Sequence, residues 1–174
     1  MSSSITIVGM GACGVAAFAD LTIRVSAVPV EGLTVNLVER DEKLGQGLAF
    51  GTDQPGHLLN TESRLMGLYD REPEHFRRWL QRRREARGRP LDPGAVEYAP
   101  RSEYGDYLRE VLHDAHERAR RAGISVAVHR SEAVAMEGDR ERSEIVLADG
   151  TRIPSAYTLL ALGTPKPLTT NFRT

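Results

Sequence analysis

The chain has 174 residues, of which 40% are hydrophobic and 27% charged, the composition of a globular protein with a core of its own. Its net charge of −1 argues against nucleic-acid binding, and the lack of a basic leader or a long apolar run argues against export and a membrane span. The single cysteine, Cys13, rules out an intrachain disulfide and a cysteine metal site, and no histidine–carboxylate spacing typical of a metal helix is visible. We therefore expect a cytoplasmic protein without a bound metal.

The segment Ile5–Gly14 predicts a buried strand followed by a tight turn. A β-branched run leads into glycines with the spacing G-x-G-x-x-G, and Val15–Arg24 then has the small, apolar composition of a crossover helix. Such a turn lets a pyrophosphate approach the backbone, and the N–H groups of the helix N-terminus face the phosphates. For the cysteine in this turn we favour a packing role over a nucleophilic one. The residues of the expected phosphate site are Gly9, Gly11, Ala12, Cys13 and Gly14.

A second buried strand is predicted at Leu33–Val38, and an acidic residue follows it. The crossover is long enough for a helix, so this strand is expected to run parallel to the first. Glu39 occupies the position where a dinucleotide fold places the carboxylate that binds the adenosine ribose, and a carboxylate there disfavours NADP. The alternative is a surface glutamate that ends a strand. Arg40 is expected to lie beside the adenine.

The segment Asp41–Asn60 is rich in glycine and turn residues. A loop of this length is uncommon in a compact domain unless it is functional. Its glycines, Gly47 among them, would let the backbone approach a ligand. His57 and Asn60 are the polar candidates for catalysis in this loop, and the alternative for His57 is a histidine that is hydrogen-bonded to the backbone.

Two helices are predicted next, within an insertion at about residues 70–122. The first, Pro73–Arg87, has an apolar face that we expect to cover the sheet edge as a lid or to serve as a dimer interface. The second begins at Ser102 or Glu103, continues to about Ala122 and is expected to pack on the sheet. The apolar face of the first helix consists of Phe76, Trp79 and Leu80.

After Gly123 the hydrophobic period changes from helical to extended. Ile124–His129 is expected to return to the parallel sheet, three short strands form a β-meander at about residues 131–154, and Tyr157–Leu162 is expected to be a last buried strand. The sequence thus predicts an α/β fold, a Rossmann-like βαβ parallel sheet with a helical insertion and a small β-meander crossover, in one domain over residues 1–174. The meander strands are expected at Ala133–Met136, Glu144–Leu147 and Thr151–Ile153.

Several of these motifs together resemble the FAD/NAD(P)-binding flavoprotein superfamily. They are the turn G-M-G-A-C-G, the acidic Glu39 and the final strand L-L-A-L-G-T-P-K-P, which is similar to the family's A-T-G strand motif with Leu in place of Thr. Within the superfamily, the chain is most similar to the bacterial FAD-NAD(P)-binding family. That similarity rests on G-Q-G-L-A-F-G-T-D-Q-P-G-H-L-L-N-T, on the helix motif from Pro73 to Leu80, and on P-R-x-x-Y-G-x-Y-L from Pro100 to Leu108.

The resemblance implies FAD as the cofactor. The three glycines of the turn would hold the pyrophosphate, Glu39 the ribose, and the loop Gly45–Asn60 would run along the ribityl and flavin side. Val134 would contact the adenine through its backbone, and Gly163 is a further cofactor-binding candidate. Arg101 is a candidate for contact with phosphate or flavin, the alternative being a surface ion pair at a helix N-terminus.

Family members are typically much longer, with a second nucleotide or substrate region and a C-terminal segment that returns to the flavin. We therefore expect this chain to be a short form that carries the adenosine half of the site. The first hypothesis is an FAD-binding module of an oxidoreductase or monooxygenase-like system, completed by a partner chain or a homodimer through the sheet edge near Tyr157. The alternatives are a degenerate, stand-alone protein that uses the cleft for NAD, another adenosine-containing ligand or a natural-product substrate in non-redox chemistry, and a non-catalytic binding subunit.

Overall fold

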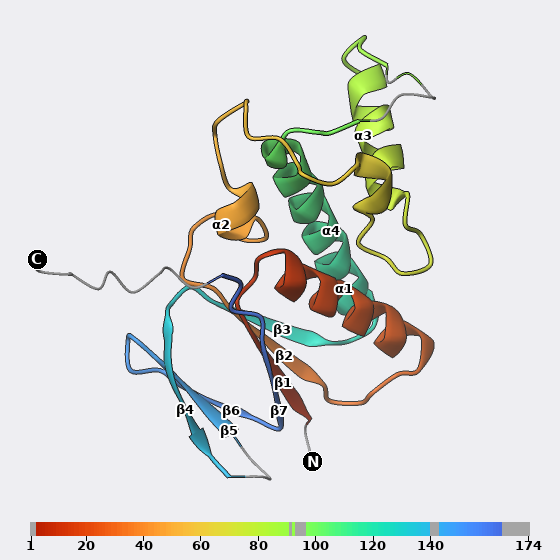
Figure 1. The fold of residues 1–174 in the computed structure, drawn as a ribbon. Helices are drawn as coiled ribbons and strands as arrows, with labels where there is room; N and C mark the ends of the chain where they lie inside the picture. The colour runs from red at the N-terminus through yellow and green to blue at the C-terminus, as the bar shows by residue number, and fades with distance from the viewer. Residues whose placement is uncertain (1–2, 91, 93–96, 140–142, 165–174) are drawn as a thin grey trace, which may run out of the picture.

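The computed structural model describes residues 3–90, 92, 97–139 and 143–164, and a parallel sheet of four strands lies at its centre (Figure 1). The strand order is β3-β2-β1-β7, and all three neighbouring pairs are parallel. In the register, Ile5 of the first strand lies opposite Val35 on one side and Tyr157 on the other. The strands are β1 (Ser4–Val8), β2 (Thr34–Val38), β3 (Ser125–His129) and β7 (Tyr157–Leu160).

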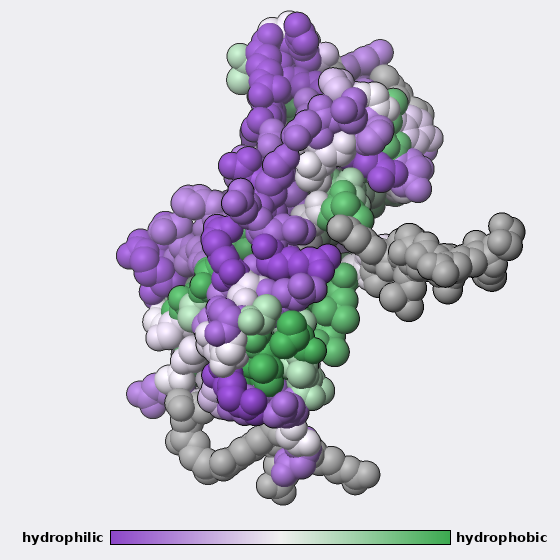
Figure 2. Space-filling view, turned by 90° about the vertical axis from the view of Figure 1, so that its left-hand side faces the viewer, coloured by the Kyte–Doolittle hydropathy of each residue, from purple (hydrophilic) through white to green (hydrophobic). Residues whose placement is uncertain are grey.

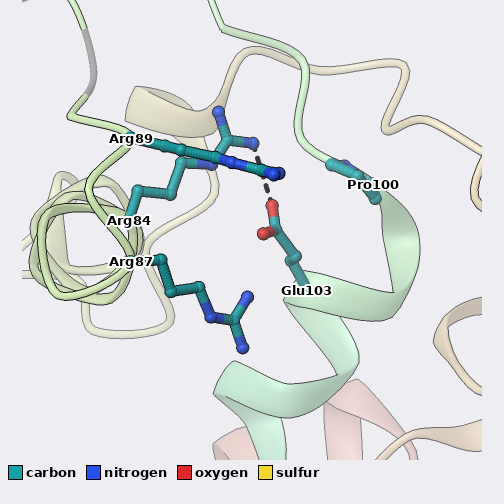
Figure 3. Close-up of a pocket in the computed structure, with 5 residues that line it drawn as sticks. All are labelled: Arg84, Arg87, Arg89, Pro100 and Glu103. Atoms are coloured by element: carbon teal, nitrogen blue, oxygen red, sulfur yellow. Dashed lines mark hydrogen bonds and ion pairs between the residues drawn. The ribbon is translucent and has the colours of Figure 1, made fainter.

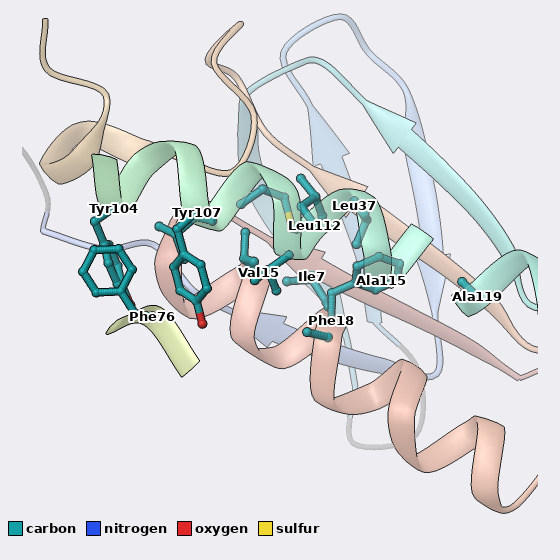
Figure 4. Close-up of a cluster of buried hydrophobic side chains, with 14 of the residues drawn as sticks. Ile7, Val15, Phe18, Leu37, Phe76, Tyr104, Tyr107, Leu112, Ala115 and Ala119 are labelled. Atoms are coloured by element: carbon teal, nitrogen blue, oxygen red, sulfur yellow. The ribbon is translucent and has the colours of Figure 1, made fainter. Parts of the chain in front are cut away.

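Two long helices, α1 (Ala12–Ala27) and α4 (Arg101–Arg121), cover one face of this sheet (Figures 1 and 4). The first helix begins at Ala12 rather than at the predicted Val15, because Gly11 already serves as its N-cap. Both helices contribute to the main core together with the sheet. The fully buried members of this core include Ile7, Val15, Phe18, Leu37, Leu108 and Ala115.

A second, antiparallel sheet packs against the opposite face. Its strand order is β4-β5-β6, which is the predicted β-meander, and it builds a smaller core with Val8 and Val38 of the parallel sheet. The α/β class and the parallel βαβ arrangement predicted from the sequence are thereby confirmed. The strands of this sheet are β4 (Ala133–Gly138), β5 (Ser143–Leu147) and β6 (Arg152–Ser155).

The remaining helices lie between β2 and α4 in the sequence: α2 (Gly47–Phe50), the 3-10 turn η1 (Ser63–Leu65) and α3 (His75–Glu85). The sequence predicted only the last of these. The apolar face of α3 is buried against α4, where Phe76 meets Tyr104 and Tyr107 at ring distances of 4.9 and 5.1 Å (Figure 4). The prediction of a lid over the sheet edge or a dimer interface at this face is therefore wrong, because α4 supplies the partner surface.

The prediction of a buried last strand is also wrong. Among the described strands β7 has a neighbour on only one side, and Tyr157 and Leu160 keep 71% and 52% of their surface exposed. Figure 2 shows apolar residues gathered over the sheet end of the molecule, below a hydrophilic upper half. Exposed apolar side chains near this end include Val134, Met136, Tyr157, Leu159, Leu160 and Leu162.

No helix in the described ranges is both long enough and apolar enough to cross a membrane.

Candidate functional site

Two glycines of the turn after β1 are required by the fold itself. Gly9 has a φ of +93°, donates its N–H to the Val38 carbonyl at 2.8 Å, and would overlap the Ala161 carbonyl if it carried a Cβ. A Cβ at Gly14 would likewise overlap the carbonyl oxygen of Gly9. These two positions let β1, α1 and the end of β7 come together at one point.

Gly11 is different, because nothing in the described chain requires glycine there. Its φ of −73° is accessible to any residue, and a Cβ would lie 3.6 Å from Gly47 Cα, an ordinary van der Waals contact. The packing of the described chain would therefore accept a Cβ at this position, where Gly47 is the neighbour.

The N-terminus of α1 is uncapped and uncharged. Its N-cap makes no side-chain hydrogen bond, and its first turn carries no acidic residue. Within the described ranges, no acceptor faces the backbone N–H groups of Gly11, Ala12, Cys13 and Gly14. Four free donors at the positive end of a 16-residue helix form a site that suits an anion.

Glu39 connects the end of β2 to this turn. Its carboxylate is buried, with 9% of the residue exposed, and accepts hydrogen bonds from the N–H groups of Met10 at 2.8 Å and Asp41 at 3.0 Å. Each carboxylate oxygen can accept further hydrogen bonds, so the group can also bind hydroxyls. The alternative of a surface glutamate that ends a strand is therefore wrong. The Glu39 side chain is buried and is held beside the glycine turn.

Three other predicted residues lie around the same ends of the strands. Arg40 pairs with Glu132 at 2.8 Å, which ties the end of β2 to the segment just before β4. Val134 follows closely, at the point where the register of β4 against β5 shifts, as at a bulge. Gly163 follows β7, two residues beyond the carbonyl that faces Gly9, and has open space around its Cα.

The loop after β2 is wedged between the glycine turn and α4. A Cβ on Gly47 would lie only 3.1 Å from Gly11 Cα, so the two backbones are in close contact. On the other side, a Cβ on Gly105 of α4 would overlap the Phe50 carbonyl and lie 2.8 Å from the buried Gln46 amide. Sequence reasoning missed Gln46, and the available signal was a glycine inside an otherwise helical segment.

The three catalytic candidates lie in the loop after β2 and at the start of α4. His57 is exposed and its Nδ1 lies 2.8 Å from Thr52 Oγ1, while Asn60 is also exposed. The backbone N–H of Arg101 donates to the His57 carbonyl at 2.7 Å, and its side-chain Nε donates to the Leu58 carbonyl at 3.1 Å. In the described part of the chain Arg101 has no carboxylate partner, and it ties the loop to the start of α4. The same ranges contain no cluster of three or more side chains that could hold a metal ion.

The profile of a family described as FAD-NAD(P)-binding matches residues 6–165. The chain belongs to this family. The match includes the glycine turn, Glu39, the loop that carries Gly47 and the described strands from residue 6 onward. The fold therefore supports a flavin or nicotinamide dinucleotide as the ligand, and the free donors at the start of α1 fit its phosphates.

Solved structures of similar fold come from larger proteins. Cyclohexanone monooxygenase from Rhodococcus sp. Phi1 bound to NADP⁺ is 20% identical, with a TM-score of 0.57 over 94% of this chain and 26% of that one. A steroid monooxygenase bound to NADP is 18% identical, with a TM-score of 0.55 over 97% and 28%. FqzB is 16% identical, with a TM-score of 0.51 over 94% and 37%. The chain thus spans about a quarter to a third of these proteins, and no curated protein matches it significantly.

Proposed function

We propose that the chain is the FAD-binding module of an oxidoreductase of monooxygenase-like type. The observation that carries the proposal is Gly11, a glycine that neither its backbone conformation nor the packing of the chain explains. Close approach of a ligand would explain glycine at this position. Four N–H groups at the same place have no acceptor within the described ranges.

Each part of the ligand has a group that suits it. The N–H groups of residues 11–14 would hold the pyrophosphate, and the Glu39 carboxylate would accept hydrogen bonds from the ribose hydroxyls. The backbone at Val134 would meet the adenine, with Arg40 beside it, and Gly47 and Gly163 would border the path toward the flavin. When bound, FAD supplies a ring system that accepts and returns two electrons, and the protein binds and orients it.

The buried carboxylate favours FAD over NADP at this turn. A 2′-phosphate on the ribose would bring two negative charges against Glu39, which is bound by backbone donors and has no cationic partner among the described residues. The ribose of FAD carries no such group.

We further propose that another polypeptide or a second copy of the chain completes the site. The surface that suits such a partner is the exposed edge of β7. This strand lies next to β1, the strand that leads into the glycine turn. In this proposal residues 1–174 act as one module in the cytoplasm. Catalytic roles for His57, Asn60 and Arg101 stay predictions.

The test is the visible absorption spectrum of the purified protein, followed by mass spectrometry of the ligand released on denaturation. We expect flavin absorption and FAD in wild type. Gly11→Val should abolish both, because its side chain would occupy the surface that the pyrophosphate needs. The Cβ of the new residue makes only an ordinary contact with Gly47 Cα.

Ala27→Val is the matched control, since it enlarges an exposed side chain at the other end of the same helix. It should keep the flavin, and circular dichroism should show native folding of both variants. A Gly11→Val protein that binds FAD as tightly as wild type would contradict the site. Release of NAD, or of no nucleotide, would contradict FAD as the ligand.

A further inference from the structure

The chain reversal at the end of α3 brings arginines together. The Gly88 N–H donates to the Glu85 carbonyl and the Arg89 N–H to the Arg84 carbonyl, both at 2.9 Å. This is the hydrogen-bond pattern of a Schellman motif, and the φ of +68° at Gly88 is the left-handed conformation that such a turn requires. Arg89 is thereby folded back beside Arg84.

These arginines line a pocket between the end of α3 and the start of α4. The pocket has a volume of about 340 Å³ and is bordered by Arg84, Arg87, Arg89, Pro100 and Glu103. Figure 3 shows the arginine side chains extending from the α3 side toward the first turn of α4. Because Pro100 is the N-cap of this 21-residue helix, the positive end of the helix dipole lies at the same wall.

The charges of the pocket do not balance. Arg84 binds Glu97 at 2.8 Å and Glu103 at 2.9 Å, so one guanidinium group takes up both nearby carboxylates. In residues 3–90, 92, 97–139 and 143–164, no carboxylate pairs with Arg87 or Arg89. Among the described residues, three cationic groups therefore face two anionic ones, and the two guanidinium groups without a carboxylate partner there border the same cavity.

We propose that this pocket binds a compact dianion, such as a phosphate monoester or a dicarboxylate, through Arg87 and Arg89. A guanidinium group presents a planar pair of donors that matches the oxygens of phosphate and carboxylate. Arg84, fixed by its two acids, forms one wall and keeps Glu103 from pairing with the other arginines. The volume lies in the range of small-molecule sites, which leaves room for the organic part of the ligand.

The proposal goes beyond the FAD site, because the pocket is built by other elements and does not include the glycine turn. Its test is calorimetric titration of the whole chain with inorganic phosphate and with malonate, at constant ionic strength. We expect saturable binding of at least one of them, and the preferred probe tells a phosphate ester from a dicarboxylate. In the double variant Arg87→Gln/Arg89→Gln, affinity should fall at least about tenfold, because two charge-assisted contacts are lost.

Two controls distinguish binding in this pocket from binding elsewhere on the chain. Arg71→Gln/Arg82→Gln removes the same charge from exposed arginines outside the pocket and should bind the probe like wild type. Gly11→Val closes the phosphate site proposed at α1, so binding that persists in this variant with the wild-type affinity is not binding at the glycine turn. Absence of saturable binding of both probes, equal affinity of wild type and Arg87→Gln/Arg89→Gln, or an equal loss in the Arg71→Gln/Arg82→Gln control would each overturn the proposal.

Discussion

Glu39 has a structural role besides the proposed binding role. Its carboxylate accepts the Met10 N–H inside the glycine turn and the Asp41 N–H after β2, so it fixes the turn against the strand end. The sequence predicted an acid at this position from its place after the strand. It could not predict the bond to Met10, because the two residues are 29 positions apart and meet only through the parallel pairing of β1 and β2.

Replacement of Glu39 by Ala should lower both stability and dinucleotide affinity. It leaves a buried N–H without an acceptor, which costs about 1–3 kcal/mol of the free energy of unfolding. Loss of the ribose contact should weaken dinucleotide binding about tenfold or more. Urea unfolding and a nucleotide titration measure the two effects. As a control, Glu42→Ala removes a nearby exposed carboxylate and should change neither the stability nor the dinucleotide affinity. An unchanged unfolding midpoint in Glu39→Ala would contradict the structural role.

At the scale of elements, the interface of α3 and α4 is an aromatic layer with a polar centre. The Tyr107 hydroxyl accepts the Leu68 N–H at 3.2 Å and lies 2.8 Å from His75 Nδ1. Burial raises the pKa of Tyr107, and burial also raises the pKa of Tyr104 to about 12, so both phenols stay neutral in this layer. Burial lowers the pKa of His75, because the charged imidazole would lose its hydration.

Acid should therefore destabilise this interface. A histidine whose pKa is lower in the folded than in the unfolded state stabilises the fold at high pH and ceases to do so as the pH falls. We expect the free energy of unfolding to decrease from about pH 7.5 to about pH 5.5, on both sides of the ordinary histidine pKa of about 6.5.

His75→Gln should reduce this pH dependence, and a smaller part should remain because burial lowers the pKa of His116 too. Unfolding curves at each pH measure the effect. Equal pH dependence in His75→Gln and wild type would show that this imidazole does not contribute.

The elements that the sequence predicted well are those with strong local patterns. β1, β2 and α4 follow from β-branched runs and from helical spacing of apolar residues. By contrast, α2 has only four residues and is held by the contact of its backbone with Gly11 and Gly105, which are distant in sequence. The predictions that Phe76 would lie on a lid or dimer face and that Tyr157 would be buried were wrong for the same reason. Whether each side chain is exposed depends on which surface covers it, and sequence periodicity does not contain that information.

At the scale of the whole molecule, the two edges of the parallel sheet differ. β4 of the antiparallel sheet begins four residues after β3. By contrast, β7 pairs only with β1 among the described residues, and none of its side chains is charged. Natural proteins protect such edges with lysine, proline or a covering segment.

We expect the isolated chain to self-associate through this edge. Leu160→Lys places a charge on β7 and should lower the apparent mass in light scattering at micromolar concentration. Val28→Lys adds the same charge at a similarly accessible apolar residue after α1 and should not change the mass. A wild-type chain that stays monomeric across the concentration range would remove the proposal of a homodimer.

The three glycines of the turn carry unequal constraints, and this has an evolutionary consequence. In a lineage that stopped binding a dinucleotide, positions 9 and 14 would remain glycine, because the backbone contacts at Ala161 and Gly9 would still select for it. At position 11 a Cβ makes only an ordinary contact, so alanine could replace glycine there once the ligand was gone. The residue at position 11 in descendants of this chain should therefore indicate whether selection for ligand binding has continued.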